Sequence, residues 1–237
     1  MILNRISGKF QLKIKNRESA GNILAETLKA EIKKGDRKDT IVLGLPRGGL
    51  IIAEIIAAKL SCPLDLIISR RLRAPHNEEL AIGSVTEDGT TYLNNMIINE
   101  LKISQEYVKN EISNQLSEIK RLIHEYFSDD KIFLDRKETN YENKTIIIVD
   151  DGAATGSTII STVRSLRKII SHSRLVVAVP VSPKGTVNLL RKEDIDHVEV
   201  ITSPKDSNFD SIEQYYQNFD QVTDKQVLDI IQRRIKK

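Results

Sequence analysis

The chain has 237 residues, of which 40% are hydrophobic and 29% are charged, with acidic and basic residues mixed along its length. This composition is typical of a globular protein with a sizeable core and excludes a disordered chain. The formal net charge of +3 is too small to indicate sequence-independent nucleic-acid binding, which needs a concentrated basic face. We therefore expect no nucleic-acid partner.

No segment has the pattern of a membrane span or a signal peptide. The longest apolar stretch, residues 49–60, is interrupted by Glu54 and Lys59 and falls short of the ~20 residues that a bilayer requires. Residues 1–16 lack the continuous apolar run of a signal peptide. The only cysteine, Cys62, has no disulfide partner and no metal-ligand spacing, which predicts a buried structural thiol. We expect a cytoplasmic protein with no membrane association.

Short apolar runs rich in β-branched residues alternate with helical patterns along the chain. The runs are apolar enough to be buried on both faces, as parallel strands are, and they span residues 40–45, 64–69, 145–149, 175–180 and 197–202. Helical periodicity covers residues 50–60, 157–170 and 184–191. We expect Ser182 to cap the last of these helices, with Pro183 in its first turn. The alternation predicts an α/β fold with helices on both faces of a parallel sheet.

Residues 80–127 interrupt this alternation. Two short strand patterns flank Glu87, Asp88 and Gly89, which predicts a β-hairpin with a positive φ at Gly89. Residues 95–127 then carry apolar side chains on one helical face, which predicts one long helix. This insertion could form a lid, a homodimer surface or a helix packed on the sheet edge. Because the sequence contains no linker, we expect residues 1–237 to form a single domain.

Two adjacent carboxylates end one of the predicted strands, in the stretch TIIIVDDGAATGST at residues 145–158. Ligands of open parallel sheets bind beyond the carboxyl ends of the strands, so Asp150 and Asp151 should face that crevice. Neighbouring ionised carboxylates repel each other, and burying them without partners is unfavourable. A metal ion, a cis-diol or arginine side chains could each compensate for that burial.

The residues that follow the two aspartates are small or carry hydroxyl groups. They are Gly152, Ala153, Ala154, Thr155, Gly156, Ser157 and Thr158. They lead into a predicted helix, whose free N-terminal amides and positive dipole end favour an anion. Carboxylates for a diol beside a loop for a phosphate favour a ribose 5-phosphate as ligand. A Walker A loop is excluded because no Gly-Lys-Ser/Thr follows.

The same stretch resembles the phosphoribosyl pyrophosphate (PRPP) motif of type I phosphoribosyltransferases. Other stretches resemble a bacterial and archaeal group of predicted phosphoribosyltransferases, namely NRESAGNILAETL, LGLPRGGLIIA, RRLRAPHNEELAIGSV and YYQNFDQVTDKQV. The resemblance spans nearly the whole chain, and Arg73, Glu78 and Glu213 depart from it. It implies the type I fold, with a hairpin-plus-long-helix insertion. It also implies that ribose 5-phosphate passes from PRPP to a nitrogen acceptor, with release of pyrophosphate and dependence on Mg²⁺.

The resemblance further implies roles for individual residues. Asp150 and Asp151 would be the catalytic pair that holds the ribose hydroxyls and contacts the metal mainly through those hydroxyls or water. Residues 152–158 would bind the 5′-phosphate. The residues implied to bind pyrophosphate are Pro46, Arg47, Gly48, Gly49, Arg70 and Arg71. Type I enzymes carry a mobile loop near this arginine cluster, which includes Arg73, so we expect a loop there.

Changing both carboxylates, Asp150→Asn with Asp151→Asn, is expected to abolish PRPP binding. Because two repelling charges are removed, the fold is expected to stay intact or to gain stability.

Ala154 bears on the identity of the acceptor. Enzymes that act on 6-oxopurines usually have an aspartate directly before Thr-Gly in this motif, so the resemblance disfavours hypoxanthine, guanine and xanthine. Adenine, uracil and acceptors that are not nucleobases stay open. The aromatic side chains of Tyr215, Tyr216 and Phe219 could stack on a base or pack in the core.

Two further residues and two alternative functions stay open at this stage. His76 could act as a general base, although a solvent-exposed histidine is the simpler interpretation. Arg17, in the stretch NRESAG, could have a structural or a substrate-side role.

A PRPP-binding regulatory protein without catalytic activity is one alternative function. A hydrolase in which water attacks PRPP is another, although no activated nucleophile is evident.

Overall fold

The computed structural model describes residues 2–6, 9–127 and 141–235. Five parallel strands form the central sheet in the order β10-β9-β8-β3-β4. The strands are β3 (Thr40–Gly44), β4 (Leu64–Leu66), β8 (Thr145–Val149), β9 (Arg174–Val181) and β10 (His197–Thr202). The predicted α/β fold with a parallel sheet is therefore confirmed, with each of the five apolar runs supplying one strand.

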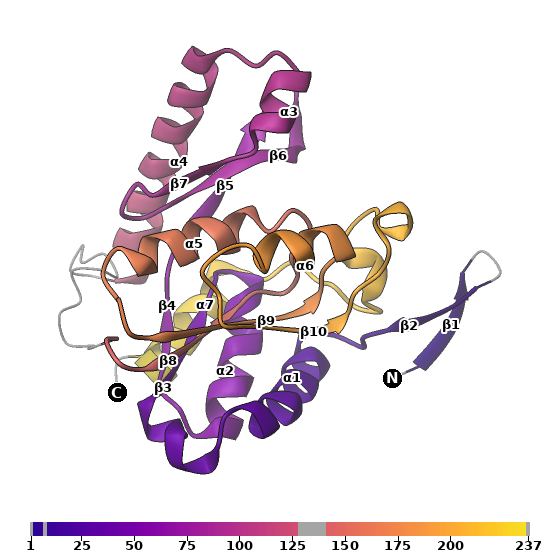
Figure 1. Cartoon of the computed structure of the whole chain (residues 1–237), viewed down its shortest axis with the longest axis vertical. Helices are drawn as coiled ribbons and strands as arrows, with labels where there is room; N and C mark the ends of the chain where they lie inside the picture. Colours follow the sequence, from indigo (N-terminus) through magenta and orange to yellow (C-terminus); the bar gives the residue numbers. More distant parts are fainter. Residues whose placement is uncertain (1, 7–8, 128–140, 236–237) are drawn as a thin grey trace.

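Helices cover both faces of this sheet (Figure 1). The helices around the sheet are α1 (Arg17–Glu31), α2 (Gly48–Leu60), α5 (Ser157–Arg167), α6 (Lys184–Leu190) and α7 (Asp224–Ile230). Successive residues of β8 point into two different cores. Ile147 and Val149 pack in the core that includes α1 and α2, and Ile146 and Ile148 pack in the core that includes α5. Burial on both faces explains why residues 146–149 of the strand are all apolar.

Two helix starts differ from the sequence-based expectations. Helix α6 has Pro183 at its N-cap instead of Ser182, and the Ser182 hydroxyl donates to the carbonyl of Ala153 (3.0 Å). The Ser182 side chain therefore ties the loop after β8 to the end of β9. Helix α1 was not predicted, although Asn16 provides a cap whose side chain accepts from the amide of Ser19 (2.9 Å).

The chain leaves the centre of the sheet in two opposite directions. From β3 it moves outward to β4, whereas from β8 it moves to β9 and then β10. The point between β3 and β8 is thus the topological switch point, where open α/β sheets bind ligands. The loops after these two strands, residues 45–47 and 150–156, lie side by side beyond it.

A second, antiparallel sheet of three strands belongs to the insertion. Its strands are β5 (Ser69–Ala74), β6 (Asn77–Thr86) and β7 (Thr91–Leu93), and two helices follow, α3 (Asn95–Glu100) and α4 (Gln105–Tyr126). The predicted hairpin is present, with φ of 82° at Gly89. The mobile loop expected at Arg70, Arg71 and Arg73 is wrong: strand β5 carries all three, paired along its length with β6. The insertion therefore begins at Ser69 and not at residue 80.

The single long helix expected over residues 95–127 is also wrong. The chain leaves the helical conformation between α3 and α4, where Lys102 adopts a left-handed backbone with φ of 52°. The Ser104 side chain then accepts from the amide of Tyr107 (3.1 Å) and begins a new helix. The apolar period continues across this break because both helices pack on the same antiparallel sheet.

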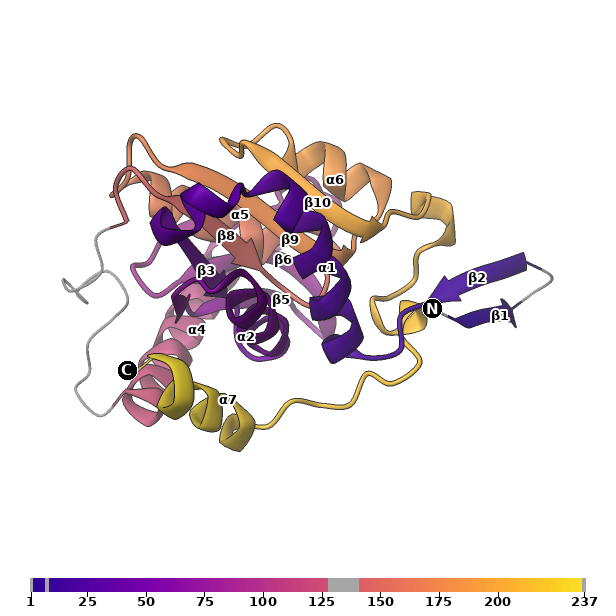
Figure 2. The same cartoon turned by 90° about the horizontal axis from the view of Figure 1, so that it is seen from below.

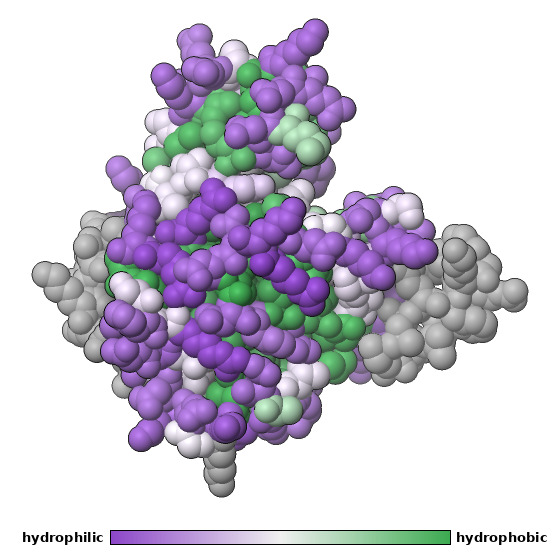
Figure 3. All heavy atoms as spheres, viewed as in Figure 1, coloured by the Kyte–Doolittle hydropathy of each residue, from purple (hydrophilic) through white to green (hydrophobic). Residues whose placement is uncertain are grey.

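The insertion projects from the body and is joined to it through buried hydroxyl groups (Figure 1). Ser84 of β6 donates to the carbonyl of Ser157 (2.6 Å) and to the hydroxyl of Ser161 (2.9 Å), both in α5. The Ser69 hydroxyl lies 3.1 Å from that of Ser161. Helix α5 begins at the end of the predicted phosphate loop, so these contacts connect the insertion to that loop. Figure 3 shows apolar side chains on the surface of the insertion. Met96 of α3 is 78% exposed.

Segments from near the two ends of the chain meet beside the sheet. Strands β1 (Ile2–Ile6) and β2 (Lys9–Lys13) form an antiparallel hairpin that extends away from the body (Figure 2). Directly after it, the Ile14 amide donates to the carbonyl of Tyr215 (2.9 Å), and the Gln217 amide donates to the carbonyl of Ile14 (2.8 Å). Helix α1 therefore starts next to the C-terminal segment. Within the described ranges, every helix is too short or too polar to cross a bilayer.

Candidate active site

The two predicted ligand-binding loops touch at the switch point. Helix α2 begins at Gly48, and a β-carbon on Gly49 would lie 2.6 Å from the carbonyl oxygen of Val149 and 2.7 Å from the Cα of Asp150. A β-carbon on Gly48 would lie 1.8 Å from Oδ2 of Asp151. Any side chain at either position would clash, so the sequence Gly48-Gly49 is required for this contact. The structure thus brings together the predicted pyrophosphate loop and the predicted ribose-binding carboxylates.

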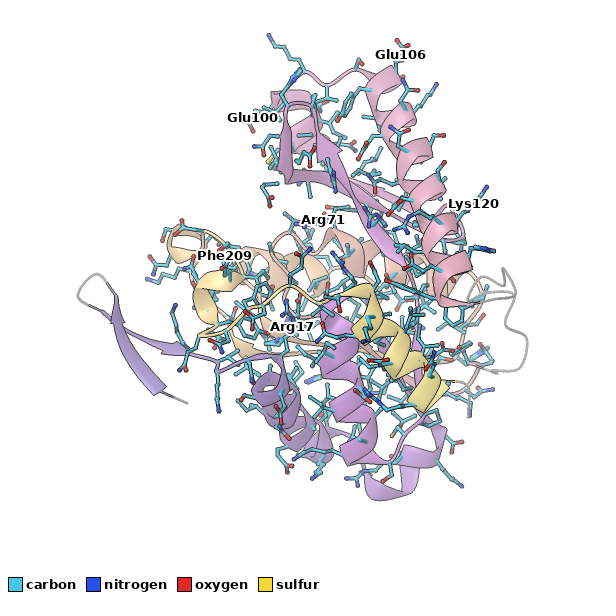
Figure 4. The ribbon with its side chains drawn as sticks, turned by 180° about the vertical axis from the view of Figure 1, so that it is seen from behind. Arg17, Arg71, Glu100, Glu106, Lys120 and Phe209 are labelled. Atoms are coloured by element: carbon cyan, nitrogen blue, oxygen red, sulfur yellow. The ribbon has the colours of Figure 1, made fainter. Side chains whose placement is uncertain are left out.

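Asp151 has an arginine partner from helix α1, 134 residues away in the sequence. Nε and Nη2 of Arg17 lie 2.8 and 2.7 Å from Oδ2 of Asp151, and the Tyr216 hydroxyl donates to the Asp151 carbonyl (2.9 Å). Of the three compensations that the sequence left open, an arginine is therefore present for this carboxylate. Figure 4 shows Arg17 and Arg71 entering this region from different elements, α1 and β5.

Asp150 lies deeper and has weaker partners. Its Oδ1 accepts from the amide of Asp151 (2.8 Å), and the Thr158 hydroxyl is 3.5 Å from its Oδ2. Burial, and then the charge of Asp151, raise the pKa of Asp150 well above its ordinary value, and the positive charge of Arg71 only partly opposes them. The two adjacent carboxylates therefore differ, because one has a close cationic partner and the other does not.

The loop after the aspartates is held open by contacts to β9 and α6. The amide of Ala153 donates to the carbonyl of Val181 (2.8 Å), and the Thr186 hydroxyl donates to the carbonyl of Ala154 (2.6 Å). Gly156 ends the loop at φ of 72°, a conformation that favours glycine. The hydroxyls of Thr155 and Ser157 lie 2.8 Å apart. The carbonyls of Ala153 and Ala154 accept from Ser182 and Thr186, and the hydroxyls of Thr155 and Ser157 lie at the N-terminus of α5, where helix amides favour an anion.

Arg47 extends from the loop after β3 toward the insertion and α7. Its Nη1 lies 3.6 Å from Oδ2 of Asp224, and the Tyr126 hydroxyl donates to Oδ1 of the same carboxylate (2.6 Å). A cavity of about 250 Å³ adjoins this group. Its lining includes Pro46, Arg47, Ser69, Arg70, Arg121 and Asp224. Asp224 and Tyr126 were not predicted as site residues, because only the fold brings α4 and α7 next to this loop.

The three arginines of β5 have different surroundings. Nε of Arg70 donates to the Gln115 side chain of α4 (2.8 Å), and burial lowers the pKa of Arg70 below its ordinary value. Arg71 is exposed and faces the Asp150 side of the site. Arg73 instead forms an ion pair with Glu78 (3.1 Å) on the outer part of the hairpin. Arg70 and Arg71 therefore belong to the site region, whereas Arg73 points away from it.

The other residues singled out from the sequence are a histidine, three aromatic residues and the cysteine. His76 occupies the turn between β5 and β6 with φ of 62° and is exposed. Tyr215 and Tyr216 are buried, with exposed fractions of 1% and 2%, and they pack in the core. Phe219 stacks on Arg17, with the guanidinium carbon 3.9 Å from its ring centroid. Cys62 is half-buried, and burial raises the pKa of its thiol to about 11.

The donor set can be compared with what Mg²⁺ requires. In the described part of the chain, no group of three or more histidine, cysteine or acidic side chains surrounds a common point. Asp150 and Asp151 offer two carboxylates at most, and Arg17 already occupies one oxygen of Asp151. Mg²⁺ commonly binds through one or two carboxylates together with waters and substrate phosphates. The residues therefore fit a metal that arrives with a phosphorylated substrate, and not a closed protein cage.

Comparison with known proteins places this geometry in context. The family profile described as "Phosphoribosyl transferase domain" matches residues 11–217. The protein named "Putative phosphoribosyl transferase Rv0571c" from Mycobacterium tuberculosis is 31% identical over 220 residues. That match covers 92% of this chain and 46% of the relative, so the chain spans about half the length of its curated relative.

One solved structure is similar over nearly the whole chain. It is the crystal structure of TT1426 from Thermus thermophilus, with 29% sequence identity and a TM-score of 0.71. The match covers 94% of this chain and 99% of that chain.

Proposed function

Because the chain belongs to the phosphoribosyl transferase family, we propose that it transfers the ribose 5-phosphate of PRPP to a nitrogen acceptor and releases pyrophosphate in a Mg²⁺-dependent reaction. One observation carries this proposal. The Asp150–Asp151 pair and the Gly48–Gly49 turn are in van der Waals contact at the topological switch point. A ligand that bears a diol and two phosphate-type groups would reach the carboxylate pair, the Gly48–Gly49 turn and the loop of residues 152–158.

The proposed orientation of PRPP follows from the order of these parts. The 5′-phosphate lies at residues 152–158, where hydroxyls and helix N-terminal amides converge. The ribose 2′- and 3′-hydroxyls donate to the carboxylates of Asp150 and Asp151. The pyrophosphate lies toward the loop after β3, near Arg47, and toward Arg70 and Arg71. The arginine-lined cavity next to Arg47 supports this direction, since guanidinium groups suit phosphate oxygens.

The reaction needs positioning and charge stabilisation more than a nucleophile from the protein. The acceptor nitrogen attacks C1 of the ribose, the bond from C1 to the pyrophosphate oxygen breaks, and pyrophosphate leaves with the electron pair. The proton of the acceptor nitrogen passes to solvent or to a base. As positive charge develops at C1, the carboxylates below the ribose stabilise it, and the arginines stabilise the leaving group.

Mg²⁺ would neutralise the pyrophosphate when it is bound. The residues that would hold it are Asp150 and Asp151, mainly through ribose hydroxyls or water. The two carboxylates are unequal in this respect, because Oδ2 of Asp151 is occupied by Arg17 and both oxygens of Asp150 have only weak or main-chain partners.

The acceptor is proposed only as a class. Ala154 offers a methyl group, and its carbonyl is occupied by Thr186 (2.6 Å), so this position provides no side chain to handle a proton on a 6-oxopurine. We propose adenine- or uracil-type bases, or related nitrogen compounds, ahead of 6-oxopurines. Phe219 is stacked on Arg17 and Tyr216 is buried, which removes both as free platforms for a base.

Pyrophosphate release tests this function directly. The purified chain is incubated with PRPP, Mg²⁺ and a panel of nucleobases, and we expect release that requires both the metal and one acceptor. An Asp150→Asn variant serves as the inactive control. PRPP binding by the wild type without turnover on any acceptor would contradict the transferase and favour a PRPP-binding regulatory protein.

A further inference from the structure

Arg17 is fixed in place by four contacts around one guanidinium group. Nε and Nη2 contact Oδ2 of Asp151 at 2.8 and 2.7 Å, and Nη1 donates to the carbonyl of Asp220 (2.7 Å). The face of the guanidinium lies 3.9 Å from the ring centroid of Phe219. The Arg17 side chain is only 12% exposed. Such a group is already ordered before any ligand arrives.

The fork of Arg17 engages only one oxygen of Asp151. Oδ1 of Asp151 accepts no hydrogen bond from the residues that the structure describes, whereas Oδ2 has two donors. The backbone of Asp151 is also held, because the Tyr216 hydroxyl donates to its carbonyl (2.9 Å). Side chain and main chain are therefore both oriented, and one carboxylate oxygen is left for a ligand.

Gly48 closes this arrangement on the side of the pyrophosphate loop. A β-carbon on Gly48 would lie 1.8 Å from Oδ2 of Asp151 and 2.9 Å from Nε of Arg17. The ion pair is thus in direct contact with the turn that begins α2. The position of Arg17 consequently affects both the carboxylate proposed to hold the ribose and the loop proposed to hold the pyrophosphate.

We propose that Arg17 is a positioning residue, which orients the Asp151 carboxylate so that Oδ1 faces the ribose hydroxyls while Oδ2 stays bound to the guanidinium. This inference rests on the proposed function. Arginine suits the role because its planar fork fixes a direction, which the point charge of a lysine does not. Because helix α1 carries this group and residues 216–220 hold it, segments from near both ends of the sequence complete the ribose site.

The competing interpretation is that Arg17 blocks the carboxylate and must be displaced by PRPP. Displacement would break the contacts to Asp220 and Phe219 as well as the ion pair and would leave a largely buried cation without partners, which is unfavourable. The two interpretations predict opposite changes in affinity. A blocking arginine strengthens PRPP binding when it is removed, and a positioning arginine weakens PRPP binding.

Calorimetric titration with PRPP and Mg²⁺ separates these cases. We expect Arg17→Met to raise the Kd for PRPP by at least about 10-fold, as for loss of a charged group that orients a ligand contact. Arg17→Lys should recover only part of the affinity. Where turnover is measurable, KM for PRPP should rise in both variants more than kcat falls. An Arg17→Met variant that binds PRPP as tightly as the wild type, or more tightly, overturns the proposal.

A matched control separates a loss of PRPP affinity from a loss of fold stability. Arg167 has a 17% exposed side chain and also binds carbonyl groups, those of Ser173 (2.7 Å) and Asp194 (3.2 Å), at the far end of α5. Arg167→Met should lose comparable stability without a change in Kd. If Arg17→Met does not fold, Arg17→Lys decides alone, and wild-type affinity in that variant contradicts an orienting fork. If the wild type itself does not bind PRPP, the proposed function is overturned. That outcome differs from a loss of PRPP affinity in the Arg17 variants alone.

Discussion

Gly48 and Asp151 are packed so closely that no side chain fits between them. A β-carbon on Gly48 would stand 1.8 Å from Oδ2 of Asp151, in a carboxylate that is already held by Arg17. The distal part of a flexible side chain could move away from such a contact, but here the ion pair prevents it. The glycine is therefore a condition for the two loops to meet.

Gly48→Ala should disrupt the site with little effect on the sheet. The added methyl group must push Asp151 or the start of α2 aside, so we expect the Kd for PRPP to rise by about 10-fold or more, as for a misplaced ligand contact. Gly35→Ala is the control, since nothing lies within 4 Å of a β-carbon there. Calorimetric titration of both variants with PRPP checks the expectation, and equal affinities would contradict it.

Asp150→Asn should stabilise the protein at neutral and alkaline pH. The pKa of Asp150 is raised in the folded state, so the ionised carboxylate is less favourable there than in the unfolded chain. The wild type is thus most stable, as far as this group is concerned, below the pKa of the unfolded carboxyl, and it loses that stability as the pH rises through the folded pKa. The gain from the amide should be present at pH 8 and absent near pH 3.

Urea unfolding of the wild type and the Asp150→Asn variant at the two pH values measures this gain in stability. A gain that is the same at both pH values would contradict a raised pKa for Asp150. Asp151→Asn should behave differently, because it leaves Arg17 without its carboxylate partner and destabilises the fold. The expectation that the double asparagine variant stays intact or gains stability thus holds, on this geometry, for only one of its two substitutions.

Arg70 and Arg73 lie in the same strand and should differ in function. Arg70 lines the cavity beside Arg47, whereas the Arg73 side chain is 42% exposed and pairs with Glu78. A charged hydrogen bond to an anion contributes about 1.5–3 kcal/mol, so Arg70→Met should weaken competitive inhibition by pyrophosphate by roughly 10- to 100-fold. Arg73→Met should leave the inhibition constant within about 2-fold. Similar losses in both variants would argue against a pyrophosphate role for Arg70.

The hydroxyl contacts between β6 and α5 should contribute measurably to stability. Ser84→Ala removes the donor to the Ser157 carbonyl and to the Ser161 hydroxyl, both of them buried. Loss of a buried hydrogen bond typically costs about 1–3 kcal/mol, which we expect in the free energy of unfolding. Ser117→Ala is the control. The Ser117 hydroxyl lies on the exposed face of α4 and donates to a carbonyl of its own helix (3.0 Å). A cost below that of the control would show that the insertion is held by other contacts.

The sheet was predictable from the sequence because its signal is local. Strand β8 occupies residues 145–149 as expected, since β-branched residues at every position suit a strand buried on both faces. The hairpin turn was equally local, with Gly89 at positive φ. The residues at the ends of β3 and β8 were identifiable for the same reason: ligand loops follow parallel strands at one edge of the sheet.

The insertion shows where local signals fail. Residues 69–74 carry three arginines in six positions, and the resemblance to type I enzymes implied a mobile loop there, yet pairing with β6 makes them a strand. Residues 95–127 keep one apolar period, yet Ser104 caps a second helix within it. The first error arose from the resemblance and the second from the apolar period, and in both segments tertiary packing decides the regular structure.

The sequence by itself determined the parallel strands, the carboxylate pair and the small-residue loop, because each depends on neighbours in the chain. Only the tertiary structure decided which partner each carboxylate has. Arg17 and Asp151 are 134 residues apart, and their ion pair exists because the N-terminal helix and the C-terminal segment meet beside the switch point. A sequence records that an arginine is present, whereas its distance and direction to a carboxylate follow only from the packing of the whole domain.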